Sequence, residues 1–183
     1  QAEDGIRDSW ASRGLGDVYK RQDLGYSNEI VDALVSSRPE KIHDILERLE
    51  AISEFVKLKE SETLSSANKR VSNILKKADK ISNNPIDENL LIENEEVVLH
   101  KVLLGLEPKI NQCLIKNDFV SALKNLVILN APINNFFEKV MVNTDDSKIK
   151  NNRYSLLFKL RQSLNCVADI SKLASWDEIN NFG

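Results

Sequence analysis

An α-helical period governs Ala67-Asn68-Lys69-Arg70-Val71-Ser72-Asn73-Ile74-Leu75-Lys76-Lys77, where positive charge and apolar side chains fall on opposite sides. Successive residues turn by about 100°, which places the polar side within an arc of roughly 120°. We call that side the basic stripe: Lys69, Arg70, Asn73, Lys76, Lys77 and Lys80. The opposite side carries Ala67, Val71, Ile74, Leu75 and Ala78. The pattern predicts a helix over residues 62–80 with its apolar side on a core and the basic stripe facing water or phosphate.

Helical periodicity continues on both sides of this stretch. Prolines and Asn/Asp clusters mark the breaks between helices. Pro39 and Pro132 are suited to first helical turns. One N-cap is expected at Asn117 or Asp118, and another at Asp145 or Asp146. Gly105 and Pro108 predict a kink or a restart. The expected helices are 39–58, 62–80, 94–116, 119–129, one from Pro132, and 147–173. The predicted fold is an all-α bundle of about seven helices.

The composition agrees with a helical domain. Hydrophobic residues make up 42% of the 183 residues and aromatic residues 6%, which favours helices over a β sandwich. No apolar run approaches the roughly 20 residues that span a bilayer, and no charged-then-apolar leader opens the chain, so we expect a cytoplasmic protein without a membrane partner. Cys113 and Cys166 stand among aliphatic residues, and both are expected to be reduced.

The first 22 residues differ from the rest. They hold three of the six glycines and one of the two tryptophans, and they show no sustained helical or strand period. We expect residues 1–22 to be non-native, adapter-like sequence or a disordered arm, residues 23–175 to form the helical domain, and residues 176–183 to be a C-terminal tail.

Two features lie far along the chain from the basic stripe. Phe136 and Phe137 belong to an apolar patch, so they either stack on bases or belong to the core, and at least one of them should be buried. Arg153 falls within the apolar arc of the last predicted helix. Its guanidinium must therefore snorkel to the surface, pair with a buried acid, or project from the rim of the core.

Two segments together resemble the C-terminal part of the β subunits of bacterial glycine–tRNA ligases. The first is Ser66-Ala67-Asn68-Lys69-Arg70-Val71-Ser72-Asn73-Ile74-Leu75-Lys76-Lys77. The second is Pro132-Ile133-Asn134-Asn135-Phe136-Phe137-Glu138-Lys139-Val140-Met141-Val142, followed by Asn152-Arg153, Leu156-Leu157 and Val167-Ala168-Asp169-Ile170-Ser171. In that family the region is a helical anticodon-binding domain of the DALR type, related to that of arginyl-tRNA synthetases.

The resemblance implies recognition of glycine tRNA at its anticodon stem and loop. The expected tRNA-binding residues are Asn68, Lys69, Arg70, Asn73, Lys76, Lys77, Lys80 and Arg153, with the stripe cations on phosphates and Asn68, Asn73 or Arg153 on base edges. Glycylation, with its ATP and magnesium, would belong to the separate α subunit, and this chain would bind no cofactor. Because the net charge is −3, RNA binding must be local.

Other function classes fit less well. His43 and His100 belong to different helices without metal-ligand spacing, and there is no glycine-rich phosphate loop or nucleophile elbow. We therefore expect no catalytic residue in this chain, although an independent helical enzyme stays open as a third class. The main alternative is a protein-interaction helical bundle whose basic stripe docks an acidic partner.

Overall fold

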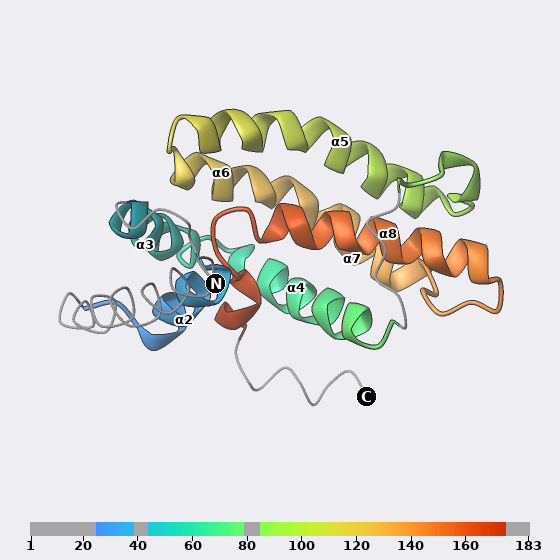
Figure 1. Ribbon diagram of the computed structural model, residues 1–183, viewed down its shortest axis with the longest axis horizontal. Helices are drawn as coiled ribbons and strands as arrows, with labels where there is room; N and C mark the ends of the chain where they lie inside the picture. Colours follow the sequence, from blue (N-terminus) through green and yellow to red (C-terminus); the bar gives the residue numbers. More distant parts are fainter. Residues whose placement is uncertain (1–24, 39–43, 79–84, 175–183) are drawn as a thin grey trace, which may run out of the picture.

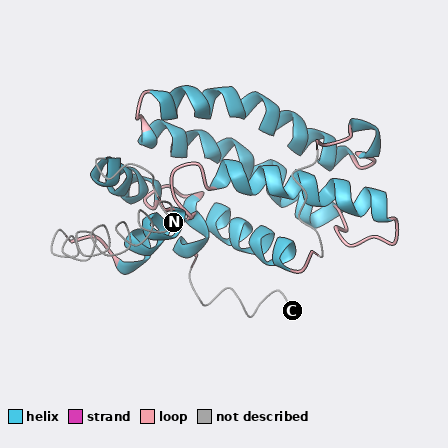
Figure 2. Cartoon of the chain, viewed as in Figure 1, coloured by secondary structure: helices cyan, strands magenta, loops and turns pink. Residues whose placement is uncertain are grey.

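The computed structural model describes residues 25–38, 44–78 and 85–174 (Figure 1). Regular structure in these ranges is helical, without strands, which confirms the predicted all-α fold (Figure 2). The α-helices are α2 (Asn28–Ser37), α3 (Ile45–Phe55), α4 (Ser61–Lys76), α5 (Asn94–Ile115), α6 (Phe119–Asn125), α7 (Asn130–Lys139) and α8 (Ser147–Leu164). Short 3-10 helices are η3 (Glu88–Leu90), η4 (Leu126–Leu129) and η5 (Ile170–Leu173). None of these helices is long and apolar enough to cross a membrane.

Helix α4 is the amphipathic helix that the sequence predicts. Leu64, Val71 and Leu75 lie on its inner side with no exposed surface. The helix contacts α7 and α8 and also the C-terminal η5 (Figure 1). It begins one residue before the predicted start, and the predicted end at residue 80 lies outside the described residues.

Local caps define the starts of α6 and α8. The Asp118 carboxylate accepts a hydrogen bond from the backbone N–H of Ser121 at 3.0 Å. The Asp146 carboxylate accepts from Lys148 N at 2.8 Å and from Ile149 N at 3.2 Å. Asp118 and Asp146 are therefore the N-caps among the predicted alternatives, because each satisfies backbone donors that the first helical turn leaves unpaired.

Of the two alternatives predicted near Gly105 and Pro108, a kink or a restart, the restart does not occur, since α5 runs unbroken from Asn94 to Ile115. Pro108 is exposed, so its ring lies on the outer side of the helix, away from the core. On the inner side, Leu103, Leu106 and Ile110 stay packed in the core. Packing on that side holds the helix together across the proline.

The predicted helix over 147–173 is too long, because α8 ends at Leu164. The backbone N–H of Asp169 donates to the carbonyl of Ala33 at 2.9 Å, and the Asp169 carboxylate caps η5 by accepting from Ser171 N at 3.2 Å. The chain therefore turns away after α8 to pack against α2. The predicted helix over 119–129 likewise divides into α6 and η4.

The two cysteines are both free. Burial raises the pKa of the Cys166 thiol to about 12, which keeps it protonated at neutral pH.

Candidate nucleic-acid interface

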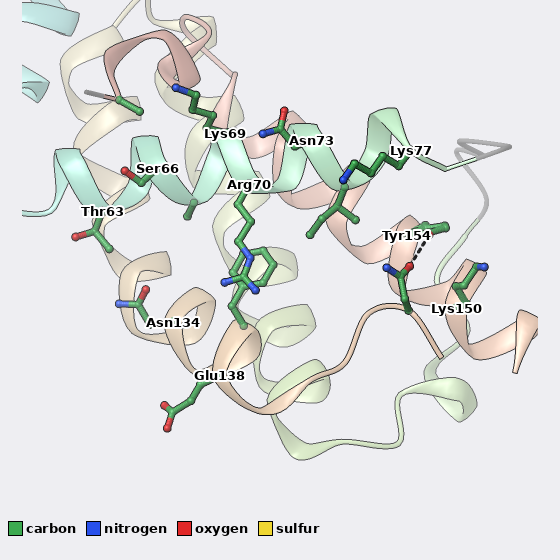
Figure 3. Close-up of a pocket in the computed structure, with 15 residues that line it drawn as sticks. Thr63, Ser66, Lys69, Arg70, Asn73, Lys77, Asn134, Glu138, Lys150 and Tyr154 are labelled. Atoms are coloured by element: carbon green, nitrogen blue, oxygen red, sulfur yellow. Dashed lines mark hydrogen bonds between the residues drawn. The ribbon is translucent and has the colours of Figure 1, made fainter. Parts of the chain in front are cut away.

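A groove of about 930 Å³ lies between α4, α7 and the first turns of α8 (Figure 3). Its lining mixes basic, amide, hydroxyl and aromatic side chains. Helix α7 follows a short 3-10 turn, and Pro132 lies in its first turn as predicted. The elements that meet at this groove are far apart in the sequence and are brought together by the contacts of α4 with α7 and α8.

The basic stripe forms one wall of the groove. Lys69, Arg70, Asn73 and Lys77 all line it; in Figure 3, Lys69 and Asn73 lie above the α4 ribbon and Arg70 extends below it. Lys76 is exposed beside the groove without lining it. Lys80 lies outside the described residues.

The opposite wall carries Phe137, and the two walls meet through an aromatic contact. The guanidinium carbon of Arg70 lies 4.2 Å from the centroid of the Phe137 ring. Phe136 has no exposed surface, and it meets Phe137 edge to face at 5.4 Å between centroids. The prediction that at least one of these phenylalanines is buried is confirmed. Phe136 belongs to the core, and it supports Phe137 at the groove.

The groove is electropositive although the chain as a whole is acidic. Lys150, in the second turn of α8, joins Lys69, Arg70 and Lys77 in the lining. Glu138 is the carboxylate among the lining residues. A cluster of cations in a hollow raises the local positive potential, and nearby anions are attracted to it.

Two of the predicted RNA-binding residues lie in the interior instead. Asn68 has no exposed surface, and its Nδ2 donates to Asn165 Oδ1 at 2.7 Å. Arg153 is 4% exposed; its Nε and Nη2 donate to the two carboxylate oxygens of Glu96 at 2.8 and 3.2 Å. Glu96 is itself fully buried, so the buried-acid alternative for Arg153 is the one that the structure adopts.

Arg153 nevertheless supports the groove from behind. Its Nη1 donates to the carbonyl of Met141 at 2.7 Å. Met141 belongs to the loop over residues 140–146, which also carries Asn143 into the groove lining. The Arg153 guanidinium thus links α5, α8 and this loop.

Several polar lining residues were absent from the sequence-based set, among them Asn143, Lys150 and Tyr154. Lys150 and Tyr154 are four positions apart on α8 and share a face, which is a signal that helical spacing provides. Nothing near Asn143 in the sequence indicates that it faces the basic stripe, because the loop reaches the groove only through tertiary packing.

His100 does not line the groove. His100 is buried on α5, where its Nε2 lies 3.7 Å from Glu88 Oε1, and His43 lies outside the described residues. Across residues 25–38, 44–78 and 85–174, no group of three or more His, Cys, Asp or Glu residues could hold a metal ion.

Comparisons with known proteins point to the same kind of ligand as the cations that line the groove. Residues 64–178 match the family described as the DALR anticodon binding domain. The chain is 44% identical over 154 residues to the glycine–tRNA ligase beta subunit of Ralstonia nicotianae, a match that covers 84% of this chain and 22% of that protein. Identity is 43% to the same subunit of Methylobacillus flagellatus and 42% to that of Dechloromonas aromatica, with the same coverage. The chain therefore spans 22% of the length of these relatives.

Proposed function

This chain belongs to the family of DALR anticodon binding domains, and from that premise we propose that its groove binds the anticodon stem and loop of a tRNA. The observation that carries the proposal is the meeting of the basic stripe with Phe137 across one groove, at 4.2 Å between Arg70 and the ring. Cations attract the phosphates of the RNA backbone, and an unpaired base can stack on an aromatic ring or on a guanidinium plane.

In this proposal the cations position the RNA. Lys69, Lys77 and Lys150 line the groove, and Lys76 extends the basic surface beside it. Contacts to phosphates fix the register of an RNA without reading its sequence. Lys80, from the same stripe, would add to this set.

Fewer side chains can contact the bases directly than the sequence suggests. Asn73 is exposed in the groove and can reach a base edge, and the Arg70–Phe137 pair offers a surface for stacking. Asn68 and Arg153 would act indirectly, because their side chains are buried and hydrogen-bonded inside the bundle. Their role in the proposal is to hold α4, α8 and the 140–146 loop in place.

The names of the relatives extend the proposal to the whole protein. Proteins 42–44% identical to this chain are called glycine–tRNA ligase beta subunits. We propose that this chain is the tRNA-reading part of such a subunit, with residues 23–175 as the module, and that glycine tRNA is its RNA partner. ATP, magnesium and the glycylation reaction would belong to the assembly with an α subunit in the cytoplasm, away from this groove.

A binding experiment tests the proposal. The 183-residue chain is titrated with glycine tRNA and with the same tRNA carrying a replaced anticodon, at near-physiological salt. The test variant is Lys69→Ala/Arg70→Ala/Lys77→Ala. The charge-matched control is Lys101→Ala/Lys109→Ala/Lys116→Ala, at exposed positions of α5 and its C-cap. We expect a preference for the native anticodon, which the control keeps, and about a tenfold or larger loss of affinity in the test variant.

Other outcomes point elsewhere. Equal affinity for both tRNAs would reduce the groove to a phosphate-binding surface. Absence of tRNA binding by a chain that shows a cooperative helical melt in circular dichroism would contradict the proposal and favour an acidic protein as the partner of the basic stripe.

A further inference from the structure

Asn143 presents a side-chain amide to the groove in a fixed orientation. The residue is exposed and belongs to the groove lining. The hydroxyl of Tyr154, a residue only 8% exposed, donates to Asn143 Oδ1 at 2.9 Å, and the dashed line in Figure 3 marks this bond. A carboxamide whose oxygen accepts from the phenol has its NH₂ group turned away from it.

The oxygen and the NH₂ group of the Asn143 side chain therefore point in different directions. Oδ1 faces Tyr154, while the Nδ2 group makes no hydrogen bond to any residue in the described ranges. Two N–H donors are thus available on an exposed side chain that borders an electropositive groove.

The loop that carries this amide is fixed on both sides. Near its start, the carbonyl of Met141 accepts from Arg153, whose guanidinium is paired with the buried carboxylate of Glu96. Val142 is 8% exposed and packs in the core. At its end, Asp146 caps α8. A side chain that is held by such supports keeps its geometry, and geometry of this kind is what selective recognition needs.

We propose that Asn143, oriented by Tyr154, donates to an acceptor atom on one unpaired base in the groove, and that it thereby helps to select that base. The ligand class is an unpaired nucleobase with a carbonyl oxygen or an unprotonated ring nitrogen on the exposed edge. This inference rests on the proposed function of the same groove. Arg153 is a positioning residue in it, because it acts through the loop and does not touch the RNA.

A purely structural role for Asn143 makes a different prediction. Tyrosine hydroxyls inside proteins usually find a hydrogen-bond partner, and Asn143 could serve Tyr154 in that way alone. The substitution Asn143→Asp separates the two roles, because the carboxylate that it introduces still accepts from Tyr154 but has no N–H to donate.

The test uses an RNA hairpin with the anticodon stem and loop of a glycine tRNA, in which each loop nucleotide is made abasic in turn. An abasic nucleotide keeps its phosphate and loses its base, so the loss of affinity at each position reports base contacts alone. The unchanged 183-residue chain is compared with Asn143→Asp, Asn143→Ala and Tyr154→Phe. Asn151→Asp is the matched control, since Asn151 is exposed on α8 outside the groove lining and carries the same change of charge.

With the unchanged chain, we expect one loop position at which removal of the base weakens binding about three- to tenfold, the range of one hydrogen bond. That penalty should fall below about twofold in Asn143→Asp and Asn143→Ala, become smaller in Tyr154→Phe, and persist in Asn151→Asp. A pattern of penalties that is the same in every variant would overturn the inference and leave the proposed function standing. If the unchanged chain does not bind the hairpin at all, the proposed function fails and the inference fails with it.

Discussion

Arg153 illustrates how one residue can match a functional pattern and still belong to the interior. Its spacing from Leu156 and Leu157 places it on the apolar side of α8, and the structure pairs it with Glu96 in the core. Asn68 has the same explanation, because it lies four residues after Leu64 and three before Val71 on the buried side of α4. In both cases helical periodicity alone indicates the interior position.

The buried ion pair gives a stability prediction. Arg153→Met leaves the Glu96 carboxylate buried without its partner, so the free energy of unfolding should fall by about 3–5 kcal/mol. The double variant Glu96→Leu/Arg153→Met should recover part of that loss, because neither charge is then buried, although Glu93 N loses its acceptor and the Met141 carbonyl its donor. Urea unfolding followed by circular dichroism measures both, with Lys148→Met on the exposed surface of α8 as a control expected to change stability by less than about 0.5 kcal/mol. A loss in Arg153→Met no larger than in that control would contradict the assigned role of the pair.

Cys166 gives a prediction about pH. The pKa of its thiol rises to about 12 in the folded chain because of burial, from the ordinary value of 9.0. Between these two values the unfolded chain releases the proton and the folded chain keeps it, so this group makes the folded state less stable as pH rises through that range. Unfolding at several alkaline pH values should show a steeper loss of stability for the unchanged chain than for Cys166→Ala. Equal slopes would show that the thiol is not buried in solution.

At the scale of single helices, local signals predict starts better than ends. The start of α4 follows from its helical period, and the starts of α6 and α8 follow from their Asp caps, all of which are properties of neighbouring residues. The end of α8 follows from the bond between Asp169 and Ala33 on α2, a contact that no local pattern contains. Helix α2 itself went unpredicted, because ten residues give a weak periodic signal.

The N-cap of α8 gives a prediction at the same scale. Asp146→Ala removes the acceptor for Lys148 N and Ile149 N, and it should lower the free energy of unfolding by about 1 kcal/mol. The adjacent Asp145→Ala is the matched control, since Asp145 is exposed and is not the cap. Chemical denaturation of the two variants side by side makes the comparison. Equal effects would mean that the cap seen here does not stabilise the helix.

At the scale of the whole molecule, the fold assembles a surface that no single segment contains. Predictions from the sequence identify the wall formed by α4, because charge and period coincide in one stretch. They point to the region of Phe137 for the rest of the surface, and the packing of α4 against α7 and α8 then adds Lys150, Tyr154 and Asn143. Helical spacing puts Lys150 and Tyr154 on one face of α8. The meeting of that face with α4, and the place of Asn143 beside it, depend on tertiary contacts that the sequence pattern does not contain.

The assembled surface predicts how binding depends on salt. Each cation that neutralises an RNA phosphate adds about 0.7 to the slope of log affinity against log salt for single strands. Lys69→Ala/Arg70→Ala/Lys77→Ala should therefore lower that slope by about two, whereas the Lys101→Ala/Lys109→Ala/Lys116→Ala control should leave it unchanged. Titrations with glycine tRNA over a range of salt concentrations measure the slopes. An equal decrease in both variants would mean that binding follows net charge and not the groove.

A crosslinking map tests most directly whether the groove binds the anticodon loop. The 183-residue chain is irradiated with the glycine-tRNA anticodon hairpin carrying 4-thiouridine at one loop position at a time, and the crosslinked peptides are identified by mass spectrometry. We expect crosslinks to the peptides that contain Phe137, Asn143 and Tyr154, and to α4. These crosslinks should be lost in the Lys69→Ala/Arg70→Ala/Lys77→Ala variant. Crosslinks confined to α5, on the other side of the bundle, would contradict it.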